Sequence, residues 1–355
     1  MSHKILLTGG GTAGHVTPNI ALLPYLKEND IEPVYIGSIS GIEKGLIEKE
    51  GIPYYGIETG KLRRYFDPKN FSDPFRVIKG YFQAKKIIKN EKPDVLFSKG
   101  GFVSVPVVRA AAKLKVPCII HESDMTPGLA NKLCIPKAKK VCCNFPETFN
   151  MVPPSKAILT GSPIRQELLT GNKEDGKKFC GFTDDKPVIM VVGGSQGSAA
   201  VNGAIRDSLG SLLPKYNIVH LTGKDKMDNM LLTVDGYRQF EYVSDELKDI
   251  FALADIVVSR AGANAICELL ALHKPNLLIP LPAGASRGDQ ILNAASYEDQ
   301  GYSMVLSEED MTSNLLVEKI NDLYQNRDKY IAAMSKSSQK DAISSILELI
   351  KDEIH

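Results

Sequence analysis

Short apolar runs of strand length alternate with longer amphipathic segments of helix length along the whole chain. This alternation is typical of parallel βαβ units, in which helices connect buried strands. The expected strands lie near residues 5–8, 34–36, 95–98, 118–121 and 140–143 in the first half, and near 188–192, 218–222, 240–243, 256–259, 276–279 and 303–306 in the second. Each set suffices for one doubly wound sheet, so the pattern predicts an α/β chain with two Rossmann-like parallel-sheet domains.

The segment Gly161-Ser162-Pro163 separates the two sets of strands. It combines a glycine with a residue whose backbone is restricted by the following proline, which indicates a hinge. We therefore expect an N-terminal domain over 1–162 and a C-terminal domain over 163–334, since 355 residues are enough for two hydrophobic cores. Apolar residues at helical spacing predict a final helix over about 335–355, which has no strand of its own and should pack back on the first domain.

Charge and composition argue against several classes of function. Lys and Arg total 43 against 42 Asp and Glu, and this balance gives no global field that would attract nucleic acid. The N-terminus enters the first strand without the apolar core of a signal peptide, and no run of about 18 apolar residues occurs, so we expect a cytoplasmic protein. Six cysteines without a C-x-x-C pair indicate buried thiols, and we expect no metal site.

A glycine-rich loop, Gly9–His15, follows the first strand and precedes a helix-like stretch. Backbone N–H groups and the positive end of a helix dipole converge there, which suits a phosphate group. The loop also satisfies G-x-G-x-x-G, but the second strand ends in Gly37-Ser38 rather than in an acidic residue for a ribose, which argues against NAD. His15 is either a hydrogen-bonding residue at a helix start or a general base, and its position favours the base.

The second half contains further loops of this kind. Gly193–Ser198 follows a strand, and Ser195 with its neighbouring amides either holds a departing diphosphate or forms an ordinary tight turn. Ser259–Glu268 repeats the architecture, and Glu268 either complements the helix dipole or accepts hydrogen bonds from a ribose diol. The loop 280–290 offers groups for sugar hydroxyls, unless it is a plain surface loop. Two phosphate loops in two halves predict a cleft that holds a phosphorylated donor and a phosphorylated acceptor.

Residues 61–92 form a basic segment, with ten Lys or Arg residues against three Asp or Glu in a chain whose net charge is +1. Phe75, Ile78 and Phe82 recur at helical spacing among these charges. This combination is typical of an amphipathic helix that lies on an anionic membrane surface. The alternative is an ordinary helix whose apolar stripe faces its own sheet.

Together these segments resemble the MurG family of GT-B glycosyltransferases, which act in bacterial cell-wall synthesis, and the resemblance covers nearly the whole chain. The matching motifs are His15-Val16-Thr17-Pro18, His121-Glu122, Pro127-Gly128, Gly161–Arg165, Gly193–Gly197, Ser259–Ala263 with Glu268, and Asp289-Gln290 with Asn293. The resemblance implies that the enzyme takes GlcNAc from UDP-GlcNAc and places it on the 4-hydroxyl of MurNAc in undecaprenyl-diphosphate-MurNAc-pentapeptide, lipid I. The product is lipid II.

The resemblance also implies roles for individual residues in an inverting displacement. No Asp-x-Asp motif lies at a strand end, so we expect catalysis without an obligatory metal, and we expect no cofactor. His15 would accept the acceptor proton, and Arg165 and Ser195 would meet the charge that develops on UDP. Glu268 would hold the ribose, and the backbone near Val243 would hold the uracil. The other residues expected at the donor are Thr12, Ala13, Gly14, Asp124, Ala263, Asn264 and Gln290, and the expected loop for the acceptor phosphates contains Gly10, Gly11 and Gly101.

A polyprenyl acceptor favours the membrane interpretation of the basic segment, with anionic lipid as a partner and the enzyme peripheral on the cytoplasmic face of the cell membrane. The residues expected at the lipid are Phe75, Ile78, Lys79, Phe82, Lys85 and Lys86. The chain departs from the family where Ser123-Asp124 replaces Gln-Asn and Asp289 replaces Gln, so Asp124 is either a sugar contact or a second base. The alternative enzyme class is a UDP-GlcNAc 2-epimerase, which shares the donor site but needs no lipid.

Overall fold

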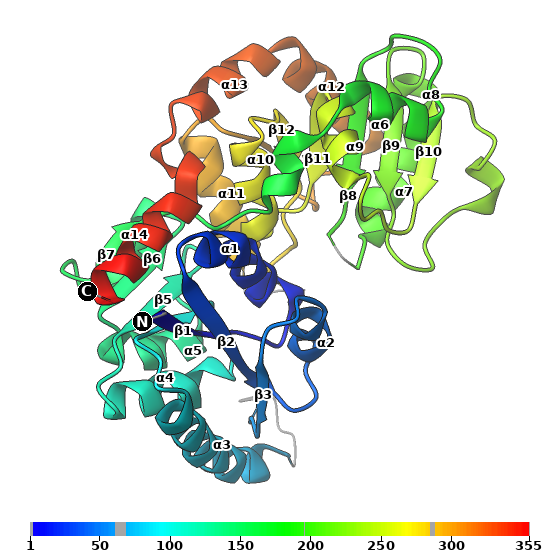
Figure 1. Cartoon of the computed structure of the whole chain (residues 1–355). Coiled ribbons are helices and arrows are strands. Elements are labelled where there is room, and N and C mark those ends of the chain that lie inside the picture. The colour runs from blue at the N-terminus through cyan, green and yellow to red at the C-terminus, as the bar shows by residue number, and fades with distance from the viewer. Residues whose placement is uncertain (1–2, 61–68, 195, 285–287, 355) are drawn as a thin grey trace. The chain divides into compact units, whose positions relative to one another are not determined.

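The computed structural model describes residues 3–60, 69–194, 196–284 and 288–354 (Figure 1). The chain forms two compact units. Unit 1 comprises Met1–Arg165 together with Asp341–His355, and unit 2 comprises Gln166–Lys340. The first unit thus ends at Arg165, whereas the sequence suggests a boundary after residue 162, and the chain returns to unit 1 from residue 341 onward.

Within the described part of unit 1, seven parallel strands form one sheet in the order β3-β2-β1-β4-β5-β6-β7. The strands are β1 (His3–Thr8), β2 (Ile31–Ser38), β3 (Tyr54–Ile57), β4 (Val95–Ser98), β5 (Cys118–Glu122), β6 (Lys140–Cys143) and β7 (Ala157–Leu159). The helical elements are η1 (Ala13–His15), α1 (Thr17–Glu28), α2 (Ile42–Lys49), α3 (Lys69–Glu91), α4 (Ser104–Lys113), α5 (Leu129–Cys134), η2 (Ile135–Lys137), η3 (Pro146–Met151) and the C-terminal α14 (Ala342–Ile354). The central strand β1 places Leu6 opposite Val34 of β2 and Leu96 of β4.

Side chains of the unit 1 strands alternate between two hydrophobic layers, one on each face of the sheet. Leu6 packs in the layer formed with α3, α4 and α5. Ile5 and Leu7 pack in the opposite layer with α1, α2 and α14, to which α14 contributes Ile343 and Ile346. The last helix lies beside α1 (Figure 1) and so completes the cover of this face.

Within the described part of unit 2, six parallel strands form a sheet in the order β10-β9-β8-β11-β12-β13. The strands are β8 (Val188–Val192), β9 (Asn217–Leu221), β10 (Tyr237–Phe240), β11 (Ile256–Ser259), β12 (Asn276–Leu278) and β13 (Met304–Val305). The helical elements are η4 (Gln166–Thr170), α6 (Lys173–Cys180), α7 (Ala199–Asp207), α8 (Leu209–Leu212), η5 (Asn229–Leu231), α9 (Leu247–Leu253), α10 (Ala263–Ala271), α11 (Asp289–Asp299), α12 (Ser313–Gln325) and α13 (Arg327–Ser335), and η6 (Ser338–Asp341) leads to α14. Both sheets have the doubly wound order, so the predicted α/β fold class is confirmed.

The structure differs from the predicted strands at three places. β3 and β7 were not predicted because they lie at the edges of the sheet, where most of their residues are only partly buried. Edge strands lack the continuous apolar run that marks a buried parallel strand. The strand predicted at 240–243 is instead Tyr237–Phe240, since Tyr237 and Gln239 are buried whereas Tyr242 is exposed. Val243 therefore lies beyond the strand. Across the described residues, no helix has the length and apolar character needed to cross a membrane.

Candidate active site

The strand order of each sheet reverses at one point, between β1 and β4 in unit 1 and between β8 and β11 in unit 2. Open parallel sheets bind ligands at the carboxyl ends of the strands beside such a point. The loops that follow these strands begin at Gly9, Lys99, Gly193 and Arg260. The glycine-rich segments of the sequence thus occupy, within each unit, the edge where a parallel sheet binds its ligand.

The first glycine-rich loop is held by a buried carboxylate that the sequence pattern did not single out. Glu43, in the first turn of α2, is 1% exposed. Its Oε2 accepts a hydrogen bond from the Gly11 N–H at 3.2 Å, and its Oε1 accepts from the N–H and the hydroxyl of Ser38 at 3.0 and 2.5 Å. A Cβ on Gly10 would lie 2.6 Å from this carboxylate, and one on Gly37 would crowd the same side chain. These glycines leave room for Glu43, and Glu43 fixes the direction of the Gly11 N–H.

The loop after β4 lies directly against the first loop. Gly101 has a φ of +82°, in the left-handed region, and a Cβ there would collide with the carbonyl oxygen of Gly10. Glycine meets both conditions without strain. The structure thus brings together Gly10 and Gly101, two of the residues expected around the acceptor phosphates.

His15 ends the short helix η1 and is half-buried. Its Nδ1 lies 2.9 Å from the hydroxyl oxygen of Thr12, the residue that precedes the helix. This contact orients the imidazole ring relative to the loop, and a proton on Nδ1 leaves the lone pair on Nε2. Ala13 and Gly14 form the turn between the two residues, so the four expected site residues 12–15 share one short segment.

β5 ends in the buried pair His121 and Glu122. Burial, assisted by a neighbouring lysine, lowers the pKa of His121 well below 6.5, so the ring is neutral. Glu122 accepts hydrogen bonds from the N–H groups of Asp124 at 3.0 Å and Gly128 at 3.1 Å, and from Asn131 Nδ2 at 2.9 Å. Burial raises the pKa of Glu122 to about 7, and the charge of Asp124 adds to this rise. Asp124 therefore lies beside a second carboxyl group at the ligand edge of unit 1.

The second glycine-rich loop surrounds the start of α7. Ser198 caps the helix, since its hydroxyl oxygen accepts a hydrogen bond from the backbone of the first turn at 3.3 Å. Gly197 has a φ of +66° and lies against the carbonyl group that follows β9, where no side chain fits. Lys226 Nζ donates to the Gln196 carbonyl at 2.6 Å and ties the loop to the same segment. Ser195, expected at the diphosphate, lies outside the described residues.

Arg260 is a buried cation in the turn after β11. Its Nη2 donates to Ser198 Oγ at 2.6 Å and pairs with Glu308. Its Nη1 donates to the carbonyl oxygens of Ile279 and Pro280 at 3.0 and 3.2 Å. The fixed directions of the guanidinium N–H groups allow one side chain to join the α7 start to the loops after β12 and β13. Since the Glu308 carboxylate balances its charge, Arg260 acts here mainly by fixing these loops around the start of α7.

These loops enclose a cavity of about 620 Å³ within unit 2. It is lined by Val192, Gly193, Gly194, Gln196, Gly197, Ser198, Ala199, Ala200, Ser259, Arg260, Gly262, Ala265, Leu281, Gln290 and Glu308. Gln290 lies in the first turn of α11, where the loop predicted over 280–290 has already ended, and its Oε1 accepts a hydrogen bond from the Leu281 N–H at 3.0 Å. The volume is in the range of cavities that bind small ligands.

The structure groups the other expected donor residues less closely. Ala263 and Asn264 begin α10, next to a glycine that lines the cavity. Glu268 is half-buried in the second turn of α10, further from the helix start than expected, and Val243 is buried beyond β10. In the described part of unit 2, neither Glu268 nor Val243 lines this cavity. Arg165 is the last residue of unit 1.

Glu43, Lys99 and Arg260 shape these loops, although the sequence did not mark them as site residues. A usable signal exists for two of them, because Lys99 and Arg260 directly follow buried strands that end at the ligand edge. A charged residue at such a position is carried to the site by its strand. Glu43 offers no comparable signal, since it lies on a helix and is placed by tertiary contacts.

Comparisons with known proteins agree for both halves of the chain. The glycosyltransferase family 28 N-terminal domain matches residues 5–143, and the glycosyltransferase family 28 C-terminal domain matches residues 188–350. The chain is 64% identical to the UDP-N-acetylglucosamine--N-acetylmuramyl-(pentapeptide) pyrophosphoryl-undecaprenol N-acetylglucosamine transferase of Lachnospira eligens, over 98% of this chain and 99% of the relative. It is 61% identical to the protein of the same name from Lachnoclostridium phytofermentans, over 98% of each.

Solved glycosyltransferase and epimerase structures share the fold of this chain. The crystal structure of MurG from Acinetobacter baumannii matches with a TM-score of 0.79 at 26% identity, over 99% of each chain. A UDP-GlcNAc 2-epimerase from Neisseria meningitidis shares the fold, with a TM-score of 0.70 at 14% identity, over 98% of this chain and 100% of that one. With family 28 models matching both halves and identity above 60% over nearly the full length, the chain belongs to the MurG family of glycosyltransferases.

Proposed function

We propose that the protein transfers GlcNAc from UDP-GlcNAc to the MurNAc unit of undecaprenyl-diphosphate-MurNAc-pentapeptide and so forms lipid II in peptidoglycan synthesis. The observation that carries this proposal is identity of 64% and 61%, over nearly the whole chain, to relatives whose names state this donor and acceptor. The UDP-GlcNAc 2-epimerase shares only the fold, at 14% identity.

In this proposal unit 2 binds UDP-GlcNAc. The loop at the start of α7 offers backbone N–H groups and the positive helix end to the diphosphate, and Arg260, paired with Glu308, holds the cap of that helix in place. Glu268 accepts hydrogen bonds from the ribose, while Gln290 and Asn264 bind GlcNAc hydroxyls. The bond between the anomeric carbon and the diphosphate oxygen breaks, its electron pair goes to UDP, and the positive groups stabilise that charge.

Unit 1 supplies the acceptor side and the base. In this proposal His15 Nδ1, which lies 2.9 Å from the Thr12 hydroxyl oxygen, carries the proton, and this tautomer leaves the lone pair on Nε2. The MurNAc 4-hydroxyl oxygen attacks the anomeric carbon while its proton passes to His15 Nε2. A single displacement of this kind converts the α-linked donor into a β-linked product. The loops at Gly10 and Gly101 flank the acceptor diphosphate.

Transfer of labelled GlcNAc to a soluble short-chain analogue of lipid I tests the proposal. Labelled disaccharide-lipid should accumulate in proportion to the UDP released, and UDP release should depend on the analogue. Turnover of UDP-GlcNAc that is equally fast without the analogue, and that leaves the lipid unlabelled, would refute the transferase and favour the epimerase.

We also propose that unit 1 contacts anionic lipid through α3, at the cytoplasmic face of the cell membrane. Phe75, Ile78 and Phe82 are 75%, 55% and 61% exposed, so this apolar stripe faces away from the protein. The helix packs on its own sheet through a different set of residues, which includes the buried Ala84 and Ile88. The exposed stripe supports lipid contact over packing on the sheet.

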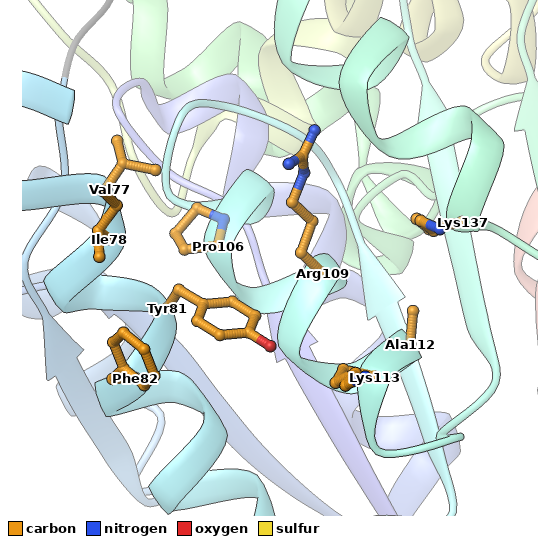
Figure 2. A pocket seen from close by; sticks show the side chains of 9 residues that line it. All are labelled: Val77, Ile78, Tyr81, Phe82, Pro106, Arg109, Ala112, Lys113 and Lys137. Atoms are coloured by element: carbon orange, nitrogen blue, oxygen red, sulfur yellow. The ribbon is translucent and has the colours of Figure 1, made fainter. Parts of the chain in front are cut away.

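A cavity of about 620 Å³ adjoins this stripe between α3, α4 and η2 (Figure 2). It is lined by Val77, Ile78, Tyr81, Phe82, Pro106, Arg109, Ala112, Lys113 and Lys137. The ring of Tyr81 extends from α3 toward α4 (Figure 2). Apolar walls next to basic groups suit an acyl chain with an anionic headgroup.

The basic residues of α3 add to this surface. Lys86 is exposed and Lys85 is half-buried. Lys79 Nζ lies 3.2 Å from Glu58 Oε1, with 64% of the lysine side chain exposed. Exposed ion pairs contribute little to stability, so Lys79 can exchange Glu58 for a lipid phosphate at small cost.

Replacement of Lys79, Lys85 and Lys86 by Glu tests the lipid proposal. Sedimentation with phosphatidylglycerol vesicles should be lost, activity on lipid I in membranes should fall, and transfer to the soluble analogue should persist. The matched control makes the same charge change on α6, at Lys173, Lys177 and Lys178, and it should sediment like the wild type. Vesicle binding at low salt that is unchanged in the α3 variant would refute the lipid contact.

A further inference from the structure

Lys99 is a buried lysine at the ligand edge of unit 1. It follows Ser98, the last residue of β4, and precedes the Gly100-Gly101 loop, yet it is only 1% exposed. Its Nζ lies 2.9 Å from His121 Nδ1, 2.8 Å from Ser123 Oγ and 3.0 Å from Ser162 Oγ. The side chain therefore joins the end of β4 to the end of β5 and to the segment after β7.

The contact with His121 fixes the direction of its hydrogen bonds. His121 Nε2 lies 2.8 Å from the Gly161 carbonyl oxygen, which can only accept, so Nε2 carries the proton and Nδ1 the lone pair. Nδ1 thus accepts from Lys99, as the hydroxyl oxygens of Ser123 and Ser162 can also do. These three contacts give an acceptor to each of the three N–H groups of an ammonium.

Lys99 also lies close to both loops that flank the proposed acceptor diphosphate. Its N–H donates to the Thr8 carbonyl at 2.9 Å, and its Cβ would lie 3.3 Å from a Cβ placed on Gly9. Two residues further along, Gly101 packs against Gly10. The backbone and Cβ of Lys99 therefore adjoin the first loop, and its side chain runs from there to the ends of β5 and β7.

A buried ammonium is costly for the fold. Removing a charge from water lowers stability unless its partners compensate, and an apolar side chain of similar length would fill such a space at lower cost. A cation at this position therefore needs a reason beyond filling the space. A fixed positive charge in a site of low dielectric does favour an anionic ligand, because the interaction is weakly screened there.

We propose that Lys99 is a positioning residue that holds the acceptor loops of unit 1 and provides a fixed positive charge at the ligand edge for the diphosphate of the lipid acceptor. The inference rests on the proposed function for the identity of the anion. It also gives Ser123 a role, since the hydroxyl at this position, where the family commonly has Gln, accepts a hydrogen bond from Lys99.

The test compares Lys99→Met with two other variants. Lys99→Met keeps the length of the side chain and removes the charge, whereas Ser162→Ala removes one acceptor and keeps the charge. Lys27→Met removes a charge from the far end of α1, where Lys27 is exposed. Thermal melting identifies folded variants, and if Lys99→Met does not fold, Lys99→Gln replaces it.

The first readout is steady-state kinetics with the soluble lipid I analogue. Lys99→Met should raise the acceptor KM about tenfold, equivalent to about 1.4 kcal/mol, and leave the KM of UDP-GlcNAc within twofold. Lys99→Arg should recover part of the loss, Ser162→Ala should raise the acceptor KM less than threefold, and Lys27→Met should behave like the wild type. Equal effects of Lys99→Met and Ser162→Ala would show that the hydrogen-bonded cross-link matters rather than the charge, and would overturn the proposal.

The second readout is calorimetric binding of inorganic pyrophosphate in the presence of saturating UDP, which occupies the donor site. Lys99→Met should weaken this binding about tenfold. The measurement needs no turnover, so a wild-type protein without transferase activity would refute the proposed function and leave this test in place. A pyrophosphate Kd that is unchanged in Lys99→Met, or wild-type protein that binds no pyrophosphate, would overturn the role of Lys99 while the transfer reaction stands.

Discussion

Glu122 provides a quantitative test of the electrostatics at the ligand edge of unit 1. The carboxyl group is buried, and burial raises its pKa from 4.5 to about 7 despite the hydrogen bonds from Asn131 and from the backbone of Asp124 and Gly128. In the unfolded chain the same group is in water and keeps its ordinary pKa. The native state therefore holds a proton that the unfolded state releases between pH 4.5 and pH 7.

The sign of the effect on stability follows from this difference. Below pH 4.5 the group is protonated in both states, and its full contribution is present. As the pH rises through about 7, the native state binds more protons than the unfolded state, so the free energy of unfolding falls. A rise of the pKa from 4.5 to about 7 corresponds to roughly 3 kcal/mol, at about 1.4 kcal/mol for each pKa unit.

Glu122→Gln isolates the pH-dependent contribution, because glutamine has nearly the same shape and does not titrate. One accepting oxygen becomes a donor in the variant, but that cost is the same at every pH. Urea unfolding of both proteins at pH 4.5, 5.5, 6.5 and 7.5 gives the difference in the free energy of unfolding at each pH. We expect the wild type to lose about 3 kcal/mol relative to Glu122→Gln between the lowest and the highest pH. A difference that stays constant within about 1 kcal/mol would refute the raised pKa.

Asp124→Asn is the matched control for the charge contribution. The carboxylate of Asp124 raises the pKa of Glu122, so its removal should move the loss of stability to lower pH. The variant should also keep substantial transferase activity, because it restores the amide that the family commonly has at this position. A loss of activity as deep as that of a missing general base would instead show that the Asp124 carboxylate is catalytic.

The remaining predictions concern the base, the donor and the first loop. His15→Ala should lower kcat about a hundredfold to ten-thousandfold and leave calorimetric UDP-GlcNAc binding nearly intact; turnover within threefold of the wild type would rule out the base. Glu268→Ala should weaken donor binding by about 1.5–3 kcal/mol and lose the preference for ribose over 2′-deoxyribose donors; a retained preference would place Glu268 away from the ribose. Glu43→Gln should lower the free energy of unfolding by roughly 1–3 kcal/mol, since one oxygen that accepts from Gly11 or Ser38 becomes a donor; unchanged urea unfolding would contradict that role.

The sequence predicted the central strands well because each is buried on both faces. β1, β4, β8 and β11 consist of apolar runs whose residues are almost all buried, and they end at the glycine-rich turns. Edge strands such as β3 have partly exposed residues and therefore no such run. The apolar residues Phe240, Tyr242 and Val243 led to a wrong position for β10, because Tyr242, although aromatic, is exposed.

The candidate site was predictable where one segment of the chain forms it. The segment 12–15 and the turn 193–198 both arise from local glycine and strand patterns. Glu43 was not predictable in this way, and Lys99 could be recognised only by its position directly after β4, since the contacts of both residues are with partners far away in the sequence. Lys99 contacts Ser162, 63 residues later, and Glu43 reaches back 32 residues to the Gly11 N–H.

Glycine-rich loops depend on such partners for a physical reason. Glycine has no side chain with which to pack and loses more conformational freedom on folding than other residues, so groups outside the loop must fix its shape. In unit 2 that group is a cation, since Arg260 joins the cap of α7 to the loops after β12 and β13. In unit 1 the Glu43 carboxylate accepts a hydrogen bond from the Gly11 N–H, and the side chain of Lys99 lies against Gly9. A glycine pattern in a sequence therefore predicts where a phosphate would bind, whereas the buried charged residues around it, such as Glu43, fix the directions of the N–H groups in the loop.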